Sequence, residues 1–318
     1  MASSAHPSAR SRLSTPAIAL EFAKHKIAGI LPARQMGGQF GNLSSRRPGA
    51  FHPARPGLSL GDPDVGAAIL AGKFDYAGQT LDIGVQGNPW TTPAPSRGYA
   101  DWLHSFSWLP DLLANEGEAA ELRACALVDG WLETYGKGND FAWESDRLAR
   151  RLFYWLSLWS PGLSRSEGET QIERRRLGAV RQLAALKSTL GKLSPGLARF
   201  YAGCALAMGG ARITDAGGMG RTQYLERGLD FLDTEITLQI LPDGGHISRS
   251  PAQTAKALRL LLTLDTLLAD RGVEGSREIS RAIDRLAPML AFFQRSTGEL
   301  APFHGGGEIA RGDVTELL

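Results

Sequence analysis

From Ser96 to Gln294, apolar residues recur every three or four positions, which is the spacing of amphipathic helices. Gly and Pro interrupt this pattern at short intervals, so it divides into at least seven helices joined by short loops. The predicted helices cover approximately residues 99–114, 118–135, 146–159, 170–190, 197–208, 221–240 and 276–294, with one more beginning at Pro251. Antiparallel helix pairs stack as a bundle, a solenoid or an α/α toroid. No fixed-period repeat indicates a solenoid, and the bundle and the toroid both remain open.

The chain before Ser96 has a different character. Residues 1–60 are rich in Ser, Pro, Arg and Gly, which predicts a poorly ordered N-terminal arm. A short helix is expected at residues 64–71. Apolar and polar residues then alternate over residues 74–83, a pattern that predicts one or two short strands.

A compact polar loop separates two of the predicted helices. Residues 242–245 read Pro-Asp-Gly-Gly, which favours a tight turn, and Ser250 followed by a proline predicts a helix N-cap. The imidazole of His246 and the guanidinium of Arg249 therefore lie on a loop between two helices, where functional groups are often found. The alternative is a simple connector. In the helix after the loop, polar residues are confined to a narrow seam that includes Lys256 and Arg259.

Composition excludes several classes of protein. The apolar fraction is 43%, the charged fraction is 21% and the net charge is +2, so the whole chain shows no preference for nucleic acid. No apolar run reaches the ~20 residues of a membrane span. No clear signal peptide is visible, which favours a cytoplasmic over a periplasmic location. Cys125 and Cys204 sit within apolar helical patterns and are expected in the core. Residues 174–176 are three arginines, expected on a solvated helix face.

The chain lacks the common motifs for metals and cofactors. None of the six histidines has a second histidine or a cysteine at ligand spacing, and no phosphate-binding or dinucleotide-binding motif is present. We therefore expect neither a metal nor a cofactor.

Aromatic residues gather on two of the predicted helices. Trp102 and His104 lie near Phe106 and Trp108, while Trp143 precedes a second group. Sugar rings stack on aromatic faces, so such helices can line a glycan groove. The alternative use of these side chains is a well-packed core.

Several segments together resemble the heparinase II/III family of polysaccharide lyases. The loop at residues 241–251 is the most specific, and the others are residues 99–109, 143–156, 287–293 and 300–307. The resemblance covers residues 61–318 and implies an all-α domain, an incomplete α/α toroid of antiparallel helix pairs. In the family a β-sandwich domain follows. Because the 318 residues end where the toroid should end, we expect the chain to be a fragment that holds only the helical half.

The resemblance also implies a reaction, β-elimination next to a uronic acid. The chemistry needs a group that neutralises the carboxylate, a base, and an acid for the leaving oxygen. The Tyr-His pair common in the family corresponds here to Gln253 and Thr254, which cannot transfer protons near neutral pH. The remaining catalytic candidates are His246 as base and Arg249 as carboxylate partner. The expected substrate contacts are Trp102, His104, Trp143, Arg147, Arg199 and Asp243.

Three functions follow from these observations. The first is a polysaccharide lyase, or its helical half, that cleaves uronic-acid-containing glycans. The second is a catalytically inactive glycan-binding or envelope-polysaccharide assembly protein on the same scaffold. In both, the partner is an acidic polysaccharide or oligosaccharide. The third is an inverting glycoside hydrolase, for which Asp243 and Glu144 are the candidate carboxylates. Whether the chain is an enzyme stays open, with a carbon–oxygen lyase as the leading class.

Overall fold

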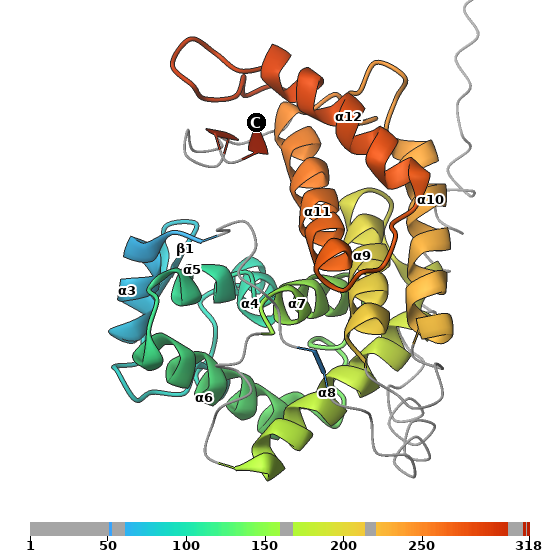
Figure 1. Cartoon of the computed structure of the whole chain (residues 1–318). Helices are drawn as coiled ribbons and strands as arrows, with labels where there is room; N and C mark the ends of the chain where they lie inside the picture. Colours follow the sequence, from blue (N-terminus) through green and yellow to red (C-terminus); the bar gives the residue numbers. More distant parts are fainter. Residues whose placement is uncertain (1–50, 53–60, 160–167, 214–220, 305–313, 316) are drawn as a thin grey trace, which may run out of the picture.

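The computed structural model describes residues 51–52, 61–159, 168–213, 221–304 and 314–318 apart from residue 316. Within these ranges the chain is mostly helical, and in Figure 1 the helices follow one another around an incomplete ring. This confirms the prediction of a helical, incomplete toroid. The predicted N-terminal arm lies almost wholly outside the described residues and stays a prediction.

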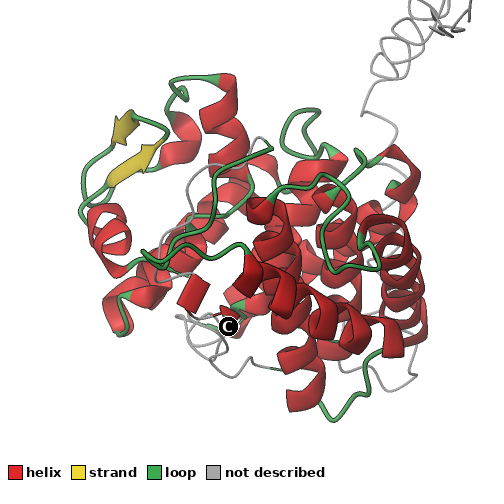
Figure 2. Ribbon diagram, turned by 90° about the horizontal axis from the view of Figure 1, so that it is seen from above, coloured by secondary structure: helices red, strands yellow, loops and turns green. Residues whose placement is uncertain are grey.

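A short hairpin sits at one edge of the helical ring (Figure 2). Helix α3 (Pro63–Leu70) leads into strands β1 (Lys73–Tyr76) and β2 (Gln79–Asp82), which pair antiparallel with Phe74 opposite Leu81. The two turn residues between the strands, Ala77 and Gly78, both have positive φ, as a tight hairpin turn requires. The predicted helix and strands are confirmed.

Nine further α-helices are described, and most of them pack against helices one or two places away along the chain. Helix α7 contacts α9, α9 contacts α10 and α11, and α11 contacts α12. Their bounds are α4 (Arg97–His104), α5 (Leu109–Ala114), α6 (Glu118–Tyr135), α7 (Ser145–Ser157), α8 (Glu169–Ser188), α9 (Leu197–Arg212), α10 (Arg227–Gln239), α11 (Pro251–Asp270) and α12 (Arg277–Phe292). Three short helices complete the set: η2 (Pro89–Thr91), η3 (Leu190–Lys192) and a π-helical turn, η4 (Arg221–Glu226).

The predicted single helix over residues 99–114 is wrong. Phe106 has φ 58°, a left-handed conformation that ends α4 and lets the chain turn before α5 begins. The segment between α5 and α6 is held by a side-chain hydrogen bond rather than by a polar N-cap. Gly117 is the N-cap of α6, and the Asn115 side chain donates to the carbonyl of Pro63, 2.5 Å away.

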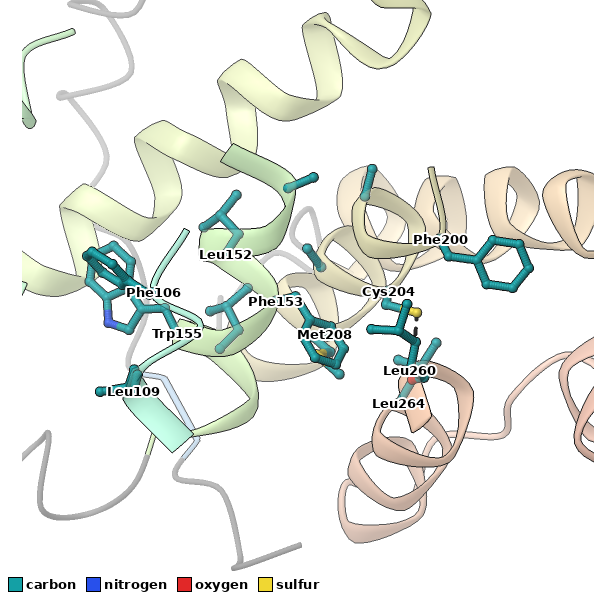
Figure 3. Packing of buried hydrophobic residues seen from close by; sticks show 14 of the residues in the cluster. Phe106, Leu109, Leu152, Phe153, Trp155, Phe200, Cys204, Met208, Leu260 and Leu264 are labelled. Carbon is teal, nitrogen blue, oxygen red and sulfur yellow. Dashed lines mark hydrogen bonds between the residues drawn. The ribbon is translucent and has the colours of Figure 1, made fainter. Parts of the chain in front are cut away.

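Helix α9 forms the centre of the core (Figure 3). Its Phe200, Cys204 and Met208 are fully buried, and Figure 3 shows Met208 beside Phe153 of α7 and Cys204 beside Leu260 of α11. Small residues let α9 approach its neighbours closely. A Cβ atom on Gly203 would lie 3.0 Å from the Leu232 side chain of α10, and 3.0 Å is too short for ordinary carbon–carbon contact.

The structure tests two further predictions about individual residues. Cys125 and Cys204 are buried and form no disulfide, which confirms their place in the core. The prediction that the three arginines at residues 174–176 form a solvated helix face is wrong for the central one. Arg175 is 1% exposed, and its Nε lies 2.7 Å from Oδ1 of Asp129 on α6, an ion pair that joins α8 to α6.

Candidate functional site

The loop between α10 and α11 is rigidly built. Gly244 has φ 85°, and a Cβ atom there would lie 2.1 Å from the carbonyl oxygen of Arg285 on α12. Only glycine therefore fits this corner. The carboxylate of Asp243 accepts from the amide of Gly245 (3.0 Å), and Ser250 caps α11 by accepting from the amide of Gln253 (3.4 Å). The predicted turn and N-cap are confirmed.

His246 is 3% exposed and uses both ring nitrogens inside the protein. Its Nε2 lies 3.1 Å from Oε1 of Gln239, and its Nδ1 lies 2.8 Å from the hydroxyl of Ser248. The amide of Gln239 donates to Oε2 of Glu235 (2.8 Å), so its Oε1 must accept from the ring. Nε2 therefore carries the proton, and Nδ1 accepts from Ser248. Burial lowers the pKa of His246, which keeps the ring neutral at pH 7.

The same network includes Arg199. Its Nη1 pairs with Oε1 of Glu235 at 2.9 Å, so two predicted site residues, Arg199 and His246, are joined through Glu235 and Gln239. No lone pair of the imidazole is left for a substrate proton in this arrangement. The roles predicted for His246 as base and Arg199 as a substrate contact stay predictions.

Arg249 and the first turn of α11 lie at the surface of this loop. Arg249 has φ 57° and pairs with Asp243 at 2.5 Å, with both side chains about half exposed. This pairing lowers the pKa of the Asp243 carboxyl. Gln253 is partly buried. Thr254 is 1% exposed, and its hydroxyl accepts from the amide of His246 (3.3 Å) and donates to the carbonyl of Ser250 (3.1 Å).

A second group of predicted residues surrounds His104 at the end of α4. Trp131 donates from Nε1 to Nδ1 of His104 (3.1 Å), so the ring proton is on Nε2. Burial, aided by the charges of Arg151 and Arg147, lowers the pKa of His104 to about 4. His104 is thus a neutral core residue rather than a surface group.

The two tryptophans of this group are both partly buried and differ in their partners. Trp102 is partly buried and stacks parallel to Tyr76 of the hairpin, with ring centroids 4.9 Å apart. Trp143 donates from Nε1 to the carbonyl of Tyr135 (2.7 Å) and stacks near Trp131. Trp102 with Tyr76 forms an aromatic surface that sequence reasoning missed in part, because Tyr76 comes from a separate element.

Arg147 closes one end of α7. It is 3% exposed, lies 2.5 Å from Asp101, pairs with Glu144, and stacks over the ring of Phe141 at 3.7 Å. Glu144 and Asp243, the carboxylates considered for glycoside hydrolysis, are therefore each held in an ion pair. Nothing in these contacts favours them as a catalytic pair.

A further group of side chains, which we name the basic face, was not predicted as a site. It consists of Arg150 and Tyr154 of α7, Tyr201 of α9, and Lys256 and Arg259 of α11. The hydroxyls of Tyr154 and Tyr201 lie 3.2 Å apart. The charges of Arg150 and Arg259 act on both tyrosines and on Lys256, so the five side chains are close in space. The polar seam on the helix after Pro251 was the one sequence signal for this group.

Burial dominates the electrostatics of the basic face. Burial raises the pKa of both tyrosines. For Tyr154, the hydrogen bond with Tyr201 offsets part of this rise in pKa. Lys256 reaches solvent, yet burial of part of the side chain and the charges of Arg150 and Arg259 lower its pKa. Three cations thus meet on facing helices, an arrangement that favours a bound anion.

Among the described residues, no group of three or more His, Cys, Asp or Glu side chains is placed to hold a metal ion. Within the same ranges, no helix combines the length and apolar character that a membrane crossing needs.

Comparison with solved structures identifies the fold. Heparinase III, the BT4657 gene product, superposes with a TM-score of 0.56 and 13% identity over 92% of this chain and 49% of its own. A mutant of the heparan sulfate lyase HepC from Pedobacter heparinus gives 0.56 and 15% over 93% and 48%. The chain has the fold of the helical part of heparinase III. At these identities the likeness establishes the fold alone. The chain matches no model of a known protein family.

A curated relative adds information of another kind. FtsZ-localized protein C from Caulobacter vibrioides is 34% identical over 261 residues, which are 81% of this chain and 43% of the relative. The chain therefore spans less than half of that relative and about half of the lyases that share its fold. The relative's name states a location with FtsZ and no lyase activity.

Proposed function

We propose that this helical domain binds an acidic glycan along the basic face and that the protein acts at sites where FtsZ assembles. The relative at 34% identity supports the location, and the heparinase III fold supports a glycan as the ligand. The observation that carries the proposal is the convergence of Arg150, Lys256 and Arg259 beside a hydrogen-bonded tyrosine pair.

Physical reasons favour an anionic sugar at this face. Burial, and after it the charges of Arg150 and Arg259, lower the pKa of Lys256. The cations repel one another, and a carboxylate or sulfate would relieve this repulsion. Lys256 and Arg259 are three residues apart, about 4.5 Å along α11. Tyrosine hydroxyls beside them donate to sugar oxygens without adding charge.

Binding without cleavage fits the neighbouring loop. The Tyr-His pair of family lyases corresponds to Gln253 and Thr254, and Thr254 is buried and hydrogen-bonded within the loop. His246 has both nitrogens occupied. A domain with these features holds a glycan strand but lacks a ready base at this position.

The test compares binding and turnover in the full-length protein. Calorimetry with size-defined uronate oligosaccharides should show binding, while an uncharged glucan of the same length should bind at least tenfold more weakly. Neither the wild type nor His246→Ala should form the unsaturated uronate product, which is detected by its ultraviolet absorbance. Equal affinity for the uncharged glucan, or product formed by the wild type and lost in His246→Ala, would overturn the proposal.

Lyase activity is the second candidate, because a tyrosine is the acid that such elimination requires. Tyr154 and Tyr201 are hydrogen-bonded to each other at the basic face, next to cations able to neutralise a uronate. If the wild type forms unsaturated product, Tyr154→Phe and Tyr201→Phe should each reduce kcat by at least a hundredfold. Unchanged kcat in both variants would exclude this pair.

A further inference from the structure

A separate pocket of about 580 Å³ lies between α6 and α8. In Figure 1 these two helices are on the side of the ring away from α12. Apolar side chains form much of the wall, among them Leu70 at the end of α3, Val85 after β2, and Leu122 and Ala126 of α6. The volume falls within the range of small-molecule sites, roughly 300–1,000 Å³.

The charges of the side chains that line this pocket do not sum to zero. Arg175 is neutralised by Asp129, because two of its nitrogens contact the two carboxylate oxygens. Arg123 has no such partner within the described part of the chain. Its Nη2 donates to the carbonyl of Gly87 (2.9 Å), and its buried Nε has no hydrogen-bond partner in the structure. Two arginines and one aspartate line the pocket, which leaves one positive charge.

We infer that this pocket binds a small organic carboxylate with an apolar body, whose headgroup pairs with Arg123. A guanidinium recognises a carboxylate through two parallel hydrogen bonds. The side chains of Leu122, Val85 and Leu70 offer an apolar surface to the rest of such a ligand. Burial lowers the pKa of Arg123, because the charged guanidinium loses hydration free energy there. A bound anion would offset this loss.

This site is independent of the basic face. The pocket belongs to α6, α8 and the segment after β2, whereas the basic face belongs to α7, α9 and α11. A negative result at the pocket leaves the glycan proposal unaffected, and the reverse also holds.

The experiment uses phenylbutyrate, its neutral analogue phenylbutanol, and acetate as ligands of the full-length protein. Calorimetry should show saturable binding of phenylbutyrate, at least tenfold weaker binding of phenylbutanol, and none of acetate. Cys125 is 3% exposed and lines the pocket, whereas Cys204 is 0% exposed and lies outside it. Bound phenylbutyrate should therefore slow alkylation of Cys125 in a mass-spectrometric assay and leave Cys204 unchanged.

Variants assign the charge preference to Arg123. Arg123→Gln should bring the affinities for phenylbutyrate and phenylbutanol within twofold of each other. Arg181→Gln removes the same charge from an exposed position on α8 outside the pocket and should keep the tenfold preference. Leu122→Asp, at a side chain that is 47% exposed, should weaken phenylbutyrate at least tenfold if Arg123→Gln fails to fold.

Four results would overturn the inference. They are no saturable binding by the wild type, equal affinity for the acid and the alcohol, an equal loss of preference in Arg181→Gln, and self-association that itself protects Cys125.

Discussion

Two neighbouring arginines on α7 occupy opposite environments. Arg151 faces the core, where it is 0% exposed and donates to the carbonyls of His104 (3.0 Å) and Ala142 (2.8 Å) and to Gln182 (2.7 Å). Arg150 is partly exposed and belongs to the basic face, where its charge acts on Lys256 and the two tyrosines. The core-facing guanidinium has fixed partners, whereas the outer one adds to a cluster of like charges.

The same contrast separates the loop before α11 from the basic face. In the loop, His246 and Thr254 are bonded to groups of the protein itself. At the basic face, Arg150, Lys256 and Arg259 converge from facing helices, and the charges of the two arginines act on Lys256. Polar residues that are conspicuous in the sequence can therefore serve to hold the structure together, while a candidate binding surface is recognised where like charges from separate helices converge.

The largest effect is expected from removing the hydrogen bonds that the core-facing Arg151 donates. Arg151→Ala should destabilise the protein by about 3–5 kcal/mol, because it leaves two buried carbonyls and Gln182 without their donor and opens a cavity. Arg150→Ala should cost less than about 1 kcal/mol. Urea unfolding of both variants measures the difference, and equal losses would contradict the proposed division of roles.

Acid should weaken the protein through His104. Its pKa is about 4 in the fold and 6.5 in the unfolded chain, so protonation favours unfolding. The contribution of His104 to the free energy of unfolding should be fully present above pH 6.5. It should fall as the pH drops towards 4, by roughly 3 kcal/mol in total. Unfolding free energies of the wild type and His104→Gln, measured between these pH values, should show a shallower slope in the variant. Identical slopes would mean that His104 does not titrate in this range.

His246→Ala sharpens the distinction between support and binding. It should destabilise the protein by about 2–3 kcal/mol, because it leaves Gln239 without a partner for Oε1 and opens a small cavity. Glycan affinity should stay within twofold. The exposed His304 offers a matched control, since His304→Ala should change neither quantity. Loss of affinity with unchanged stability in His246→Ala would place the imidazole at the ligand.

The smallest expected effect concerns one charge of the basic face. Lys256→Gln should weaken binding of a uronate oligosaccharide two- to fivefold, or ~0.5–1 kcal/mol, because the lysine reaches solvent and its pairing is screened. Added salt should reduce the difference between wild type and variant. Lys192→Gln, at an exposed position on η3, is the control and should bind like the wild type.

Much of the fold could be predicted from the sequence, since each long helix shows its own 3.6-residue pattern and Ser250 marks the start of α11. The break at Phe106 could not, because a phenylalanine with positive φ has no local signature and is held there by tertiary packing. For the site, the seam with Lys256 and Arg259 was visible in the sequence. Its partners Arg150 and Tyr201 were not, because they come from α7 and α9, and only the packing of these helices against α11 brings them together.

The left-handed turn at Phe106 restricts what evolution can place there. The residue is 0% exposed and contacts the rings of Trp90, Trp108, Trp131 and Trp155. Glycine would relax the backbone but remove the benzyl group from this aromatic junction, and a β-branched residue would clash with the turn itself. Homologues that keep the junction should therefore retain an unbranched aromatic at this position, or replace the whole corner at once.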